Sequence, residues 1–302
     1  MNNKAIETRG LSVYYGRHRG IIDVNLTVEQ GEVFGFLGPN GAGKTTTQRV
    51  LLDVFAPTQG KASIFGLDCQ TDGVRLRKRI GYLPGELALY TNMKVSEFFR
   101  MFEYLRGENG AKGHWRELAE RLELDTTRKI RELSRGNKQK VGVVAAFMTR
   151  PDLLILDEPT GGLDPLIQRT VLDMVREAKA EGRTVFFSSH ILSEVQAVCD
   201  RVGIIRDGRL IAVHSVEELF ARRMNRINLI FDQLPPEGLF NLEGVKELDR
   251  SSQSVLLEVR DSLPEVLAAA AQHGVCDIDT HNVSLEDIFL AYYSEENGGG
   301  DA

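Results

Sequence analysis

The sequence has few cysteines and no long apolar run. Its three cysteines, Cys69, Cys199 and Cys276, are far apart in the 302 residues and form no CxxC pair. They fit neither a zinc site nor a disulfide framework, so a reducing cytosol is the expected compartment. The longest apolar run, Val141 to Met148, is far too short to span a bilayer. If the protein acts on a membrane process, another chain must supply the membrane part.

The sequence also lacks an excess of positive charge. A formal net charge of −6 argues against a nucleic-acid binder, which usually carries a basic face, and we expect no nucleic-acid partner. The apolar fraction of 42% and the charged fraction of 26% are those of an ordinary globular protein. No signal peptide is visible. The length accommodates one large and one small domain, or two mid-sized domains.

One segment near the N-terminus matches a phosphate-binding pattern, G-x-x-x-x-G-K-[ST]. A glycine-rich turn lets backbone N–H groups approach phosphate oxygens, and the following helix presents its positive end to the same anion. An apolar strand at 32–37 precedes the pattern, and a helix predicted over Thr45–Ala56, ended by Pro57, follows it. We therefore predict nucleotide binding here, with Lys44 on the β- and γ-phosphates. The predicted binding residues are Gly38, Pro39, Asn40, Gly41, Ala42, Gly43, Lys44, Thr45 and Thr46.

A second segment supplies the acids that such a site needs. The apolar run Leu153–Leu156 predicts a buried strand that delivers Asp157 at its end. Thr45 and Asp157 are the predicted Mg²⁺ ligands, and Glu158 is placed to accept a proton from an attacking water. Alone, this run also fits a buried strand that ends in two solvated acids. Together with the phosphate-binding pattern, it indicates nucleotide hydrolysis.

The periodicity of the apolar residues predicts an α/β architecture. Two alternating segments, 6–15 and 21–29, predict an antiparallel hairpin with its turn at 16–20. From residue 151 onward, apolar strands alternate with helices, which predicts a parallel sheet covered on both faces. Asp207-Gly208 signals a further hairpin turn.

A third segment completes a resemblance to the ATP-binding-cassette (ABC) ATPases. Leu133-Ser134-Arg135-Gly136-Asn137 resembles the signature motif of that family, which begins a helix and contacts the γ-phosphate of a nucleotide held by the other subunit. A serine and a glycine at a helix start offer a hydroxyl and bare N–H groups to an anion. Alone, Ser134 serves equally well as an ordinary N-cap, so the order and spacing of all the motifs carry the resemblance. It assigns Ser134, Gly136 and Asn137 to nucleotide binding.

Other positions match the same family in the same order. Gly161-Gly162-Leu163-Asp164 resembles the D-loop, which contacts the facing subunit, and also fits a plain turn with Asp164 as a helix cap. His190, at a predicted strand end, matches the switch histidine that reaches the γ-phosphate. Tyr15 matches the aromatic residue that stacks on adenine, with the adjacent Tyr14 as the competing candidate. The resemblance thus makes Glu158, His190 and Lys44 the predicted catalytic residues.

Two departures from the family pattern concern the edges of the site. Where the family usually has a glutamine, in the loop to the helical subdomain, this chain has Gly85, and the neighbouring Glu86 is a candidate substitute. The signature segment has Arg135 and Asn137 where glycine and glutamine are commonest. The serine and glycine that touch phosphate are retained, so we expect activity to survive.

The resemblance covers residues 4–221 and implies the ATP-hydrolysing subunit of a bacterial ABC exporter. The implied fold is a P-loop NTPase core with an antiparallel β subdomain and a helical subdomain, within an ATPase domain of residues 1–221. The helical subdomain is expected over about 86–145, an accessory α+β domain over 222–296 and a disordered tail over 297–302. The accessory domain is predicted to end in a helix, Ser284–Tyr292.

The resemblance also implies ligands and partners. ATP and Mg²⁺ are expected, together with a second copy of the chain in a head-to-tail dimer and an integral membrane permease. The expected location is cytoplasmic, on the inner face of the membrane. Two alternatives remain open: a regulatory or translation-associated ABC ATPase without a membrane partner, and a nucleotide-gated binding protein whose C-terminal domain senses a ligand. The sequence does not identify the transported substrate.

Overall fold

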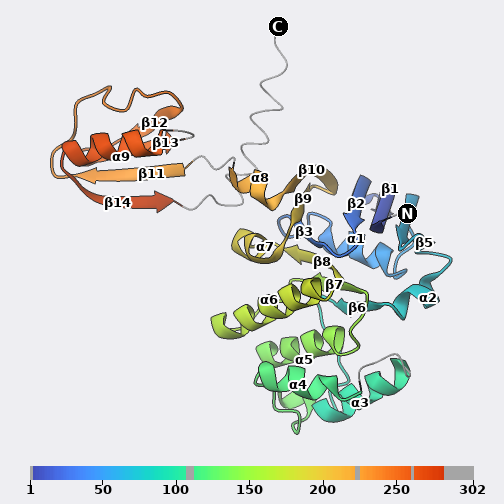
Figure 1. Ribbon diagram of the computed structural model, residues 1–302. Coiled ribbons are helices and arrows are strands. Elements are labelled where there is room, and N and C mark those ends of the chain that lie inside the picture. The colour runs from blue at the N-terminus through green and yellow to red at the C-terminus, as the bar shows by residue number, and fades with distance from the viewer. Residues whose placement is uncertain (1–2, 107–111, 222–224, 260–261, 282–302) are drawn as a thin grey trace. The chain divides into compact units, whose positions relative to one another are not determined.

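The chain divides into two compact units, residues 1–216 and 217–302. The computed structural model describes residues 3–106, 112–221, 225–259 and 262–281 (Figure 1). Among these residues, no helix combines the length and the apolar character that a membrane span requires.

A six-stranded sheet organises the first unit. Its strand order is β10-β9-β3-β8-β7-β6, in which only the β9–β10 pair is antiparallel. The register places Leu37 beside Ser189 and Asp157 beside Ser188, so β3, β7 and β8 end at the same edge. The strands are β3 (Val33–Leu37), β6 (Ile80–Leu83), β7 (Leu153–Asp157), β8 (Thr184–Ser189), β9 (Arg201–Arg206) and β10 (Arg209–Ser215).

The parallel strands are buried on both faces, as their continuous apolar sequence predicts. β3, β7 and β8 are buried along their whole length. On one face, Phe34, Phe36 and Phe186 belong to the core shared with the antiparallel sheet. On the other face, a side chain at Gly35 would meet the Sγ of Cys199 at 3.0 Å, which shows how closely the region of α7 (Leu192–Val198) packs on the sheet. Helix α6 (Pro165–Ala180) also packs against β8.

An antiparallel sheet of order β2-β1-β4-β5 forms the second layer. The predicted hairpin is present, but its turn is only Gly16–Arg17, because Tyr15 already pairs with His18. Gly16 has φ +61°, a conformation that glycine adopts without strain. The strands are β1 (Lys4–Tyr15), β2 (His18–Glu29), β4 (Gln59–Ile64) and β5 (Leu67–Asp68).

The β9–β10 turn connects the two sheets and the phosphate-binding loop. Asp207 and Gly208 have φ +50° and +76°, as the predicted two-residue hairpin turn requires. The Gly208 N–H donates to the Ala42 carbonyl at 2.9 Å, and the Gly208 carbonyl accepts from the Ile22 N–H at 2.7 Å. A Cβ at Gly208 would lie 2.7 Å from the Gly20 carbonyl oxygen, so the turn requires glycine there.

The helix after the phosphate-binding loop is shorter than predicted. Helix α1 runs from Lys44 to Leu51, whereas the sequence predicts an end at Ala56 before Pro57. Asp53 takes φ +57°, and the N–H groups of Asp53 and Val54 turn back to the carbonyls of Val50 and Arg49. This is the Schellman pattern that ends a helix, with aspartate in the place where glycine is usual. The prediction was wrong because nothing in the apolar spacing marks that left-handed residue.

The remaining helices of the first unit lie mainly beyond the sheet edge, where α3, α4 and α5 gather (Figure 1). Ser134 and Asp164 cap α5 and α6, accepting from the N–H groups of Asn137 and Ile167 at 3.2 and 3.1 Å. The elements are α2 (Gly73–Arg77), α3 (Val95–Arg106), α4 (His114–Arg121), a 3₁₀ turn (Ile130–Glu132) and α5 (Arg135–Phe147). Helix α8 (Val216–Ala221) begins at the last residue of this unit.

After α8, the described part of the second unit contains a four-stranded antiparallel sheet of order β12-β13-β11-β14 and helix α9 (Leu263–Gln272). Val266 and Ala270 of α9 share a buried core with Leu229 and Leu257 of the sheet. The predicted final helix, Ser284–Tyr292, and the predicted tail, 297–302, lie outside the described residues. The strands are β11 (Asn225–Phe231), β12 (Val245–Arg250), β13 (Ser254–Val259) and β14 (Val275–His281).

Candidate functional site

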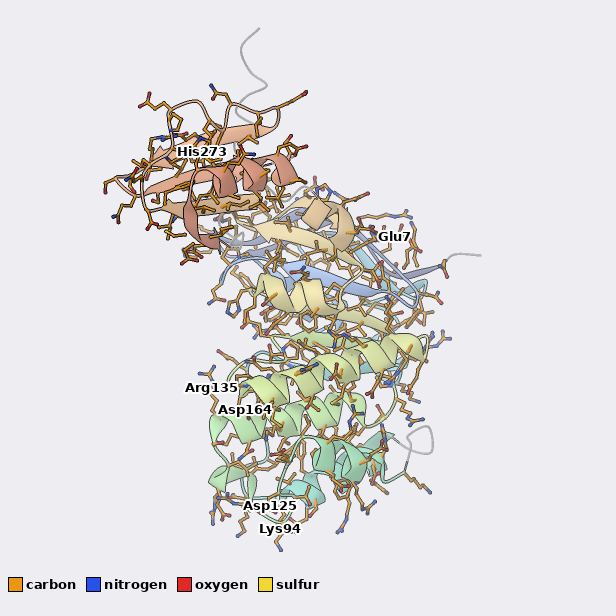
Figure 2. The ribbon with its side chains drawn as sticks, turned by 60° about the vertical axis from the view of Figure 1, so that its left-hand side comes forward. Glu7, Lys94, Asp125, Arg135, Asp164 and His273 are labelled. Atoms are coloured by element: carbon orange, nitrogen blue, oxygen red, sulfur yellow. The ribbon has the colours of Figure 1, made fainter. Side chains whose placement is uncertain are left out.

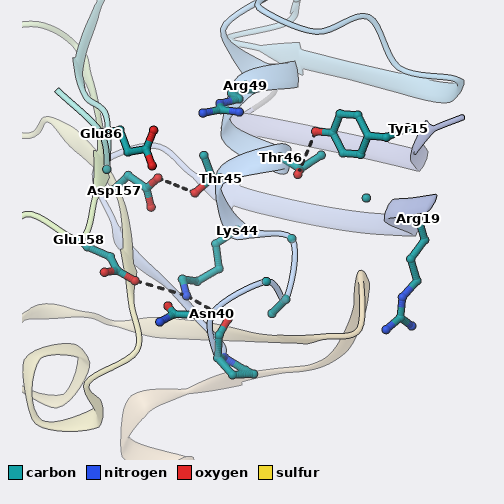
Figure 3. A pocket seen from close by; sticks show the side chains of 16 residues that line it. Tyr15, Arg19, Asn40, Lys44, Thr45, Thr46, Arg49, Glu86, Asp157 and Glu158 are labelled. Atoms are coloured by element: carbon teal, nitrogen blue, oxygen red, sulfur yellow. Dashed lines mark hydrogen bonds and ion pairs between the residues drawn. The ribbon is translucent and has the colours of Figure 1, made fainter. Parts of the chain in front are cut away.

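A cleft of about 590 Å³ lies where the predicted motifs converge. Because β3, β7 and β8 are parallel and in register, the segments that follow them meet at one sheet edge. Lys44, Thr45, Asp157 and Glu158 lie at one end of the cleft and Tyr15 at the other (Figure 3). After the roles predicted from the sequence, these are called the phosphate end and the nucleoside end. It is lined by Tyr15, Arg19, Gly20, Pro39, Asn40, Gly41, Ala42, Gly43, Lys44, Thr45, Thr46, Arg49, Gly85, Glu86, Asp157 and Glu158.

The glycines of the phosphate-binding loop are required by its geometry. Gly41 and Gly43 have φ +78° and +111°, which L side chains rarely adopt. A Cβ at Gly38 would lie 2.3 Å from the Ile205 carbonyl oxygen. The ammonium group of Lys44 donates to the carbonyls of Gly38 and Pro39 at 2.7 and 3.2 Å, and this residue is only 5% exposed. The loop therefore holds a buried cation within a glycine-rich turn at the start of α1, a combination that suits a phosphate group.

Asp157 is held by two hydroxyl groups. Thr45 Oγ1 donates to Asp157 Oδ2 at 2.7 Å, and Ser188 Oγ donates to Asp157 Oδ1 at 2.5 Å. The aspartate is 2% exposed and Ser188 is fully buried, so the hydrogen bond between them is shielded from water, whereas Thr45 lines the cleft and its hydrogen bond is only partly buried. A hydroxyl and a carboxylate oxygen at the edge of a phosphate site form the hard donor set that Mg²⁺ prefers. These residues fit the predicted metal.

Glu158 lies at the meeting point of three segments. Its Oε1 is 3.0 Å from His190 Nδ1 and 3.5 Å from Lys44 Nζ. Its backbone has φ +50°, and its carbonyl accepts from the side-chain amide of Gln139 at 3.1 Å. A glutamate in this conformation is strained, and strain of this kind clusters at functional sites. The carboxylate is partly exposed and faces the cleft, where a water molecule can reach it.

The nucleoside end is less tightly built. The hydroxyls of Tyr15 and Thr46 share a hydrogen bond at 3.2 Å, and the Tyr15 ring packs edge-on against Phe55 with centroids 5.7 Å apart. Tyr15 lines the cleft and Tyr14 does not, although both are 42% exposed. Arg19, also on the lining, forms an ion pair with Asp207 of the β9–β10 turn.

The loop after β6 brings Gly85 and Glu86 to the phosphate end. A Cβ at Gly85 would lie 3.0 Å from Asp157 Oδ2, closer than most real contacts. The position thus has little room for any side chain while Asp157 keeps this conformation. Glu86 lines the cleft (Figure 3), and its proposed role as a substitute for the missing glutamine stays a prediction.

The signature segment lies outside the cleft lining. Ser134, Gly136 and Asn137 begin α5, and none of them lines the cleft. A Cβ at Gly136 would lie 2.8 Å from the Gly162 carbonyl oxygen, so this glycine allows the two loops to touch. Arg135 and Asp164 accordingly lie near each other at one edge (Figure 2). The structure brings together the phosphate-binding loop, the two acids after β7 and His190. The signature segment does not join them in the same chain.

Two residues near the acids were missed by the sequence argument. Ser188 binds the Asp157 carboxylate, and Gln139 donates to the Glu158 and Pro159 carbonyls at 3.1 and 3.3 Å. Ser188 lies in β8, two residues before His190, and β8 pairs with β7. A predicted strand that ends beside the acids could therefore have pointed to Ser188 as a partner of Asp157. The sequence carries no signal for the role of Gln139, because a glutamine one turn into a helix is usually exposed to solvent.

Burial raises the pKa of three groups in the interior of the first unit. Burial raises the pKa of the Tyr82 phenol on β6 to about 12, and the neighbouring Asp157 charge adds to the rise. Burial likewise raises the pKa of the Cys69 thiol to about 12 and that of Cys199 well above its usual value. These buried thiols are inert packing residues.

The chain is similar to known transport ATPases. A family model described as "ABC transporter" matches residues 21–161. The chain is 37% identical over 219 residues to the ABC transporter ATP-binding protein NatA of Bacillus subtilis, covering 70% of this chain and 89% of NatA. It is 37% identical over 229 residues to the bacitracin transport ATP-binding protein BcrA of Bacillus licheniformis, covering 75% and 74%. A solved ATP-binding subunit of an ABC transporter aligns with a TM-score of 0.66 and 30% identity over 72% of this chain and 92% of that one.

The fold, the residues that line the cleft and the similarity to known proteins together define a nucleotide-binding P-loop ATPase of the cassette type. The chain belongs to the ATP-binding proteins of the ABC transporter family. The fold class and family expected from the sequence are confirmed. The roles of individual residues are predictions that the geometry supports.

Proposed function

We propose that this chain is the ATP-hydrolysing subunit that powers export through a separate membrane-spanning partner. The observation that carries the proposal is Glu158, whose carboxylate is 3.0 Å from His190 and 3.5 Å from Lys44 beside the Asp157–Thr45 pair. A general base, a cation for the phosphates and an acid beside a hydroxyl therefore share one cleft.

The proposed reaction is in-line attack of water on the γ-phosphate of ATP. Glu158 accepts the proton of that water, Lys44 offsets charge that develops on the phosphate oxygens, and His190 orients Glu158 and stabilises the transition state. Thr45 and Asp157 would hold Mg²⁺. The ion would supply charge neutralisation for the β- and γ-phosphates. Tyr15 stacks on the adenine ring and the loop glycines offer N–H groups to the phosphates.

The active form is proposed to be a head-to-tail dimer. Ser134, Gly136 and Asn137 present a capped helix start, yet they lie outside the cleft of their own chain. A second copy that faces the first would bring this helix start to the γ-phosphate, where its N–H groups and the Ser134 hydroxyl bind an anion. ATP would then close the pair and hydrolysis would open it.

The membrane partner is proposed to be a permease that holds this subunit at the cytoplasmic face of the membrane. The names of NatA and BcrA support a transport role, and that of BcrA, a bacitracin transport protein, favours drug or antibiotic export. Lipid or polysaccharide export and sodium extrusion are weaker candidates. Closure would be transmitted through residues 84–91 and the helical subdomain.

Phosphate release by the purified protein tests the ATPase proposal, and Glu158→Gln tests the role of the base. We expect Glu158→Gln to bind ATP, to accumulate as a dimer in size-exclusion chromatography and to lose turnover by about a thousandfold. Unchanged hydrolysis in this variant would remove Glu158 from the role. Membrane fractionation of native cells separates the exporter from the regulatory alternative, because a protein that stays in the supernatant and co-sediments with ribosomes has no permease role.

A further inference from the structure

A buried carboxylate lies behind the two loops that carry Glu158 and His190. Glu194, in the first turn of α7, is 7% exposed and does not line the cleft. Thr160 Oγ1 donates a hydrogen bond to its Oε1, and Ser189 Oγ donates to its Oε2 at 2.6 Å. Both of these partners are neutral hydroxyls. A buried charge is costly unless it is hydrogen-bonded, so the two hydroxyls and the carboxylate require one another.

The two hydroxyls belong to different loops. Thr160 follows Glu158 in the loop after β7, and Ser189 directly precedes His190 at the end of β8. Thr160 and Ser189 are 2% and 1% exposed, so both hydrogen bonds are shielded from water. One carboxylate thereby connects the loop of the proposed base with the loop of the proposed switch histidine.

The direction of each hydrogen bond is fixed. An ionised carboxylate only accepts, so both hydroxyl protons point to Glu194. Ser189 Oγ in turn accepts from the Ile191 N–H at 2.9 Å, which orients the residue on the far side of His190. The contacts close a ring: Glu158 to His190, Ser189, Glu194, Thr160 and back along the chain to Glu158.

We propose that Glu194 is a positioning residue for ATP hydrolysis, because its two hydrogen bonds set the separation of the β7 and β8 loops and so hold Glu158 and His190 within hydrogen-bond distance. This inference rests on the proposed ATPase function and adds a residue that touches neither the nucleotide cleft nor the reacting atoms. Displacement of catalytic groups by about 1 Å can cost about a hundredfold in rate.

Removal of the carboxylate is predicted to separate turnover from binding. Glu194→Ala should lower kcat for ATP by about tenfold to a hundredfold. Its KM should stay within about twofold of wild type, because Lys44, Thr45 and Tyr15 have no contact with Glu194. Glu194→Gln keeps an acceptor for one hydroxyl and a donor for the other, and it should restore kcat to within about threefold of wild type. Steady-state phosphate release measures both constants, below the unfolding temperature of every variant.

A double-mutant cycle with Thr160→Val tests the proposed connection, and this variant removes a single hydroxyl if Glu194→Ala fails to fold. The losses of kcat in Glu194→Ala and Thr160→Val should not be additive in the double variant, because either substitution alone breaks the same ring of contacts. Glu177→Ala is the matched control: it deletes a glutamate on α6 that pairs with Arg121 and should leave kcat unchanged.

The outcomes separate this proposal from the function on which it rests. If the wild-type protein releases no phosphate from ATP, both the proposed ATPase function and the proposed role of Glu194 are wrong. An active wild type whose Glu194→Ala variant keeps wild-type kcat overturns the positioning role alone. Equal losses in Glu194→Ala and Glu194→Gln, or additive losses with Thr160→Val, also overturn it, because they would indicate a stability effect without a ring.

Discussion

The two ends of the cleft are built differently. At the phosphate end, Lys44 and Asp157 are almost fully buried and each makes two hydrogen bonds within the fold. At the nucleoside end, Tyr15 is 42% exposed and makes one hydrogen bond and one ring contact. On the proposed assignment of the two ends, phosphate recognition is preorganised, whereas recognition of the base is completed by the ligand. Affinity for nucleotide should depend mainly on the first end.

Removal of the buried cation at the phosphate end should have the largest effect. We expect Lys44→Ala to weaken ATP binding by about a hundredfold, because a charge-assisted contact to phosphate is lost. Isothermal titration calorimetry measures the loss. Lys61→Ala, which removes an exposed cation on β4, is the control and should bind ATP normally. A loss below about fivefold for Lys44→Ala would contradict a preorganised phosphate end.

A smaller loss of activity is expected when Asp157 is retained but loses one of the two hydroxyl groups that donate to it. Ser188→Ala leaves one carboxylate oxygen without its hydroxyl donor, and we expect kcat to fall about tenfold to fiftyfold. Phosphate release at saturating ATP is the measurement. Ser193→Ala on the exposed face of α7 provides the comparison, with wild-type turnover expected. If the two serine variants behave alike, the Ser188 contact has no part in catalysis.

The nucleoside end should respond more weakly and only to one of the two tyrosines. Tyr15→Ala is expected to weaken ATP binding about tenfold through loss of stacking, and Tyr14→Ala by no more than about twofold. Tyr15→Phe keeps the ring and should bind nearly as well as wild type. Fluorescent-nucleotide titrations compare all three variants. If Tyr14→Ala weakens ATP binding more than Tyr15→Ala does, Tyr14 is the residue that stacks on the base.

The smallest effect is expected far from both ends, at the Arg121–Glu177 pair between α4 and α6. Hydrogen bonds from Arg121 lower the pKa of Glu177, so its ionised form stabilises the fold. That stability is present above the unfolded pKa of about 4.3 and disappears as the pH falls through the lower folded value. The pair is largely exposed, so solvent screening limits Glu177→Gln to about 0.5 kcal/mol at pH 7.

Urea unfolding of Glu177→Gln and wild type at pH 7 and near pH 3.5 checks the sign of this prediction. The difference in unfolding free energy should shrink at the lower pH. Turnover at pH 7 should be the same for both proteins. A difference that grows as the pH falls would mean that the pair does not act through the ionised carboxylate.

The sequence predicted the phosphate end better than the rest of the site. The pattern from Gly38 to Thr45 and the strand before Asp157 are local signals, because the turn and the buried strand each need residues close together in the chain. Ser188 and Gln139 act across strands and helices, and only the tertiary fold shows their contacts. The end of α1 was also mispredicted, since a left-handed aspartate at 53 leaves no trace in apolar spacing.

The parallel sheet, the hairpin and the capped helices followed from periodicity and from cap residues such as Ser134 and Asp164. The close approach of Gly136 to Gly162 did not, because it depends on how two loops far apart in sequence pack. Sequence patterns thus predicted which segments exist, and the structure alone gave the distances between their side chains.

The Asp207–Gly208 turn joins two walls of the cleft. Its single glycine is bonded both to Ala42 in the phosphate-binding loop and to Ile22 in the strand that leads away from Tyr15. Through these two hydrogen bonds the turn couples the position of the phosphate-binding loop to that of β2. A residue inserted in the turn would displace Gly208 from both of these partners at once.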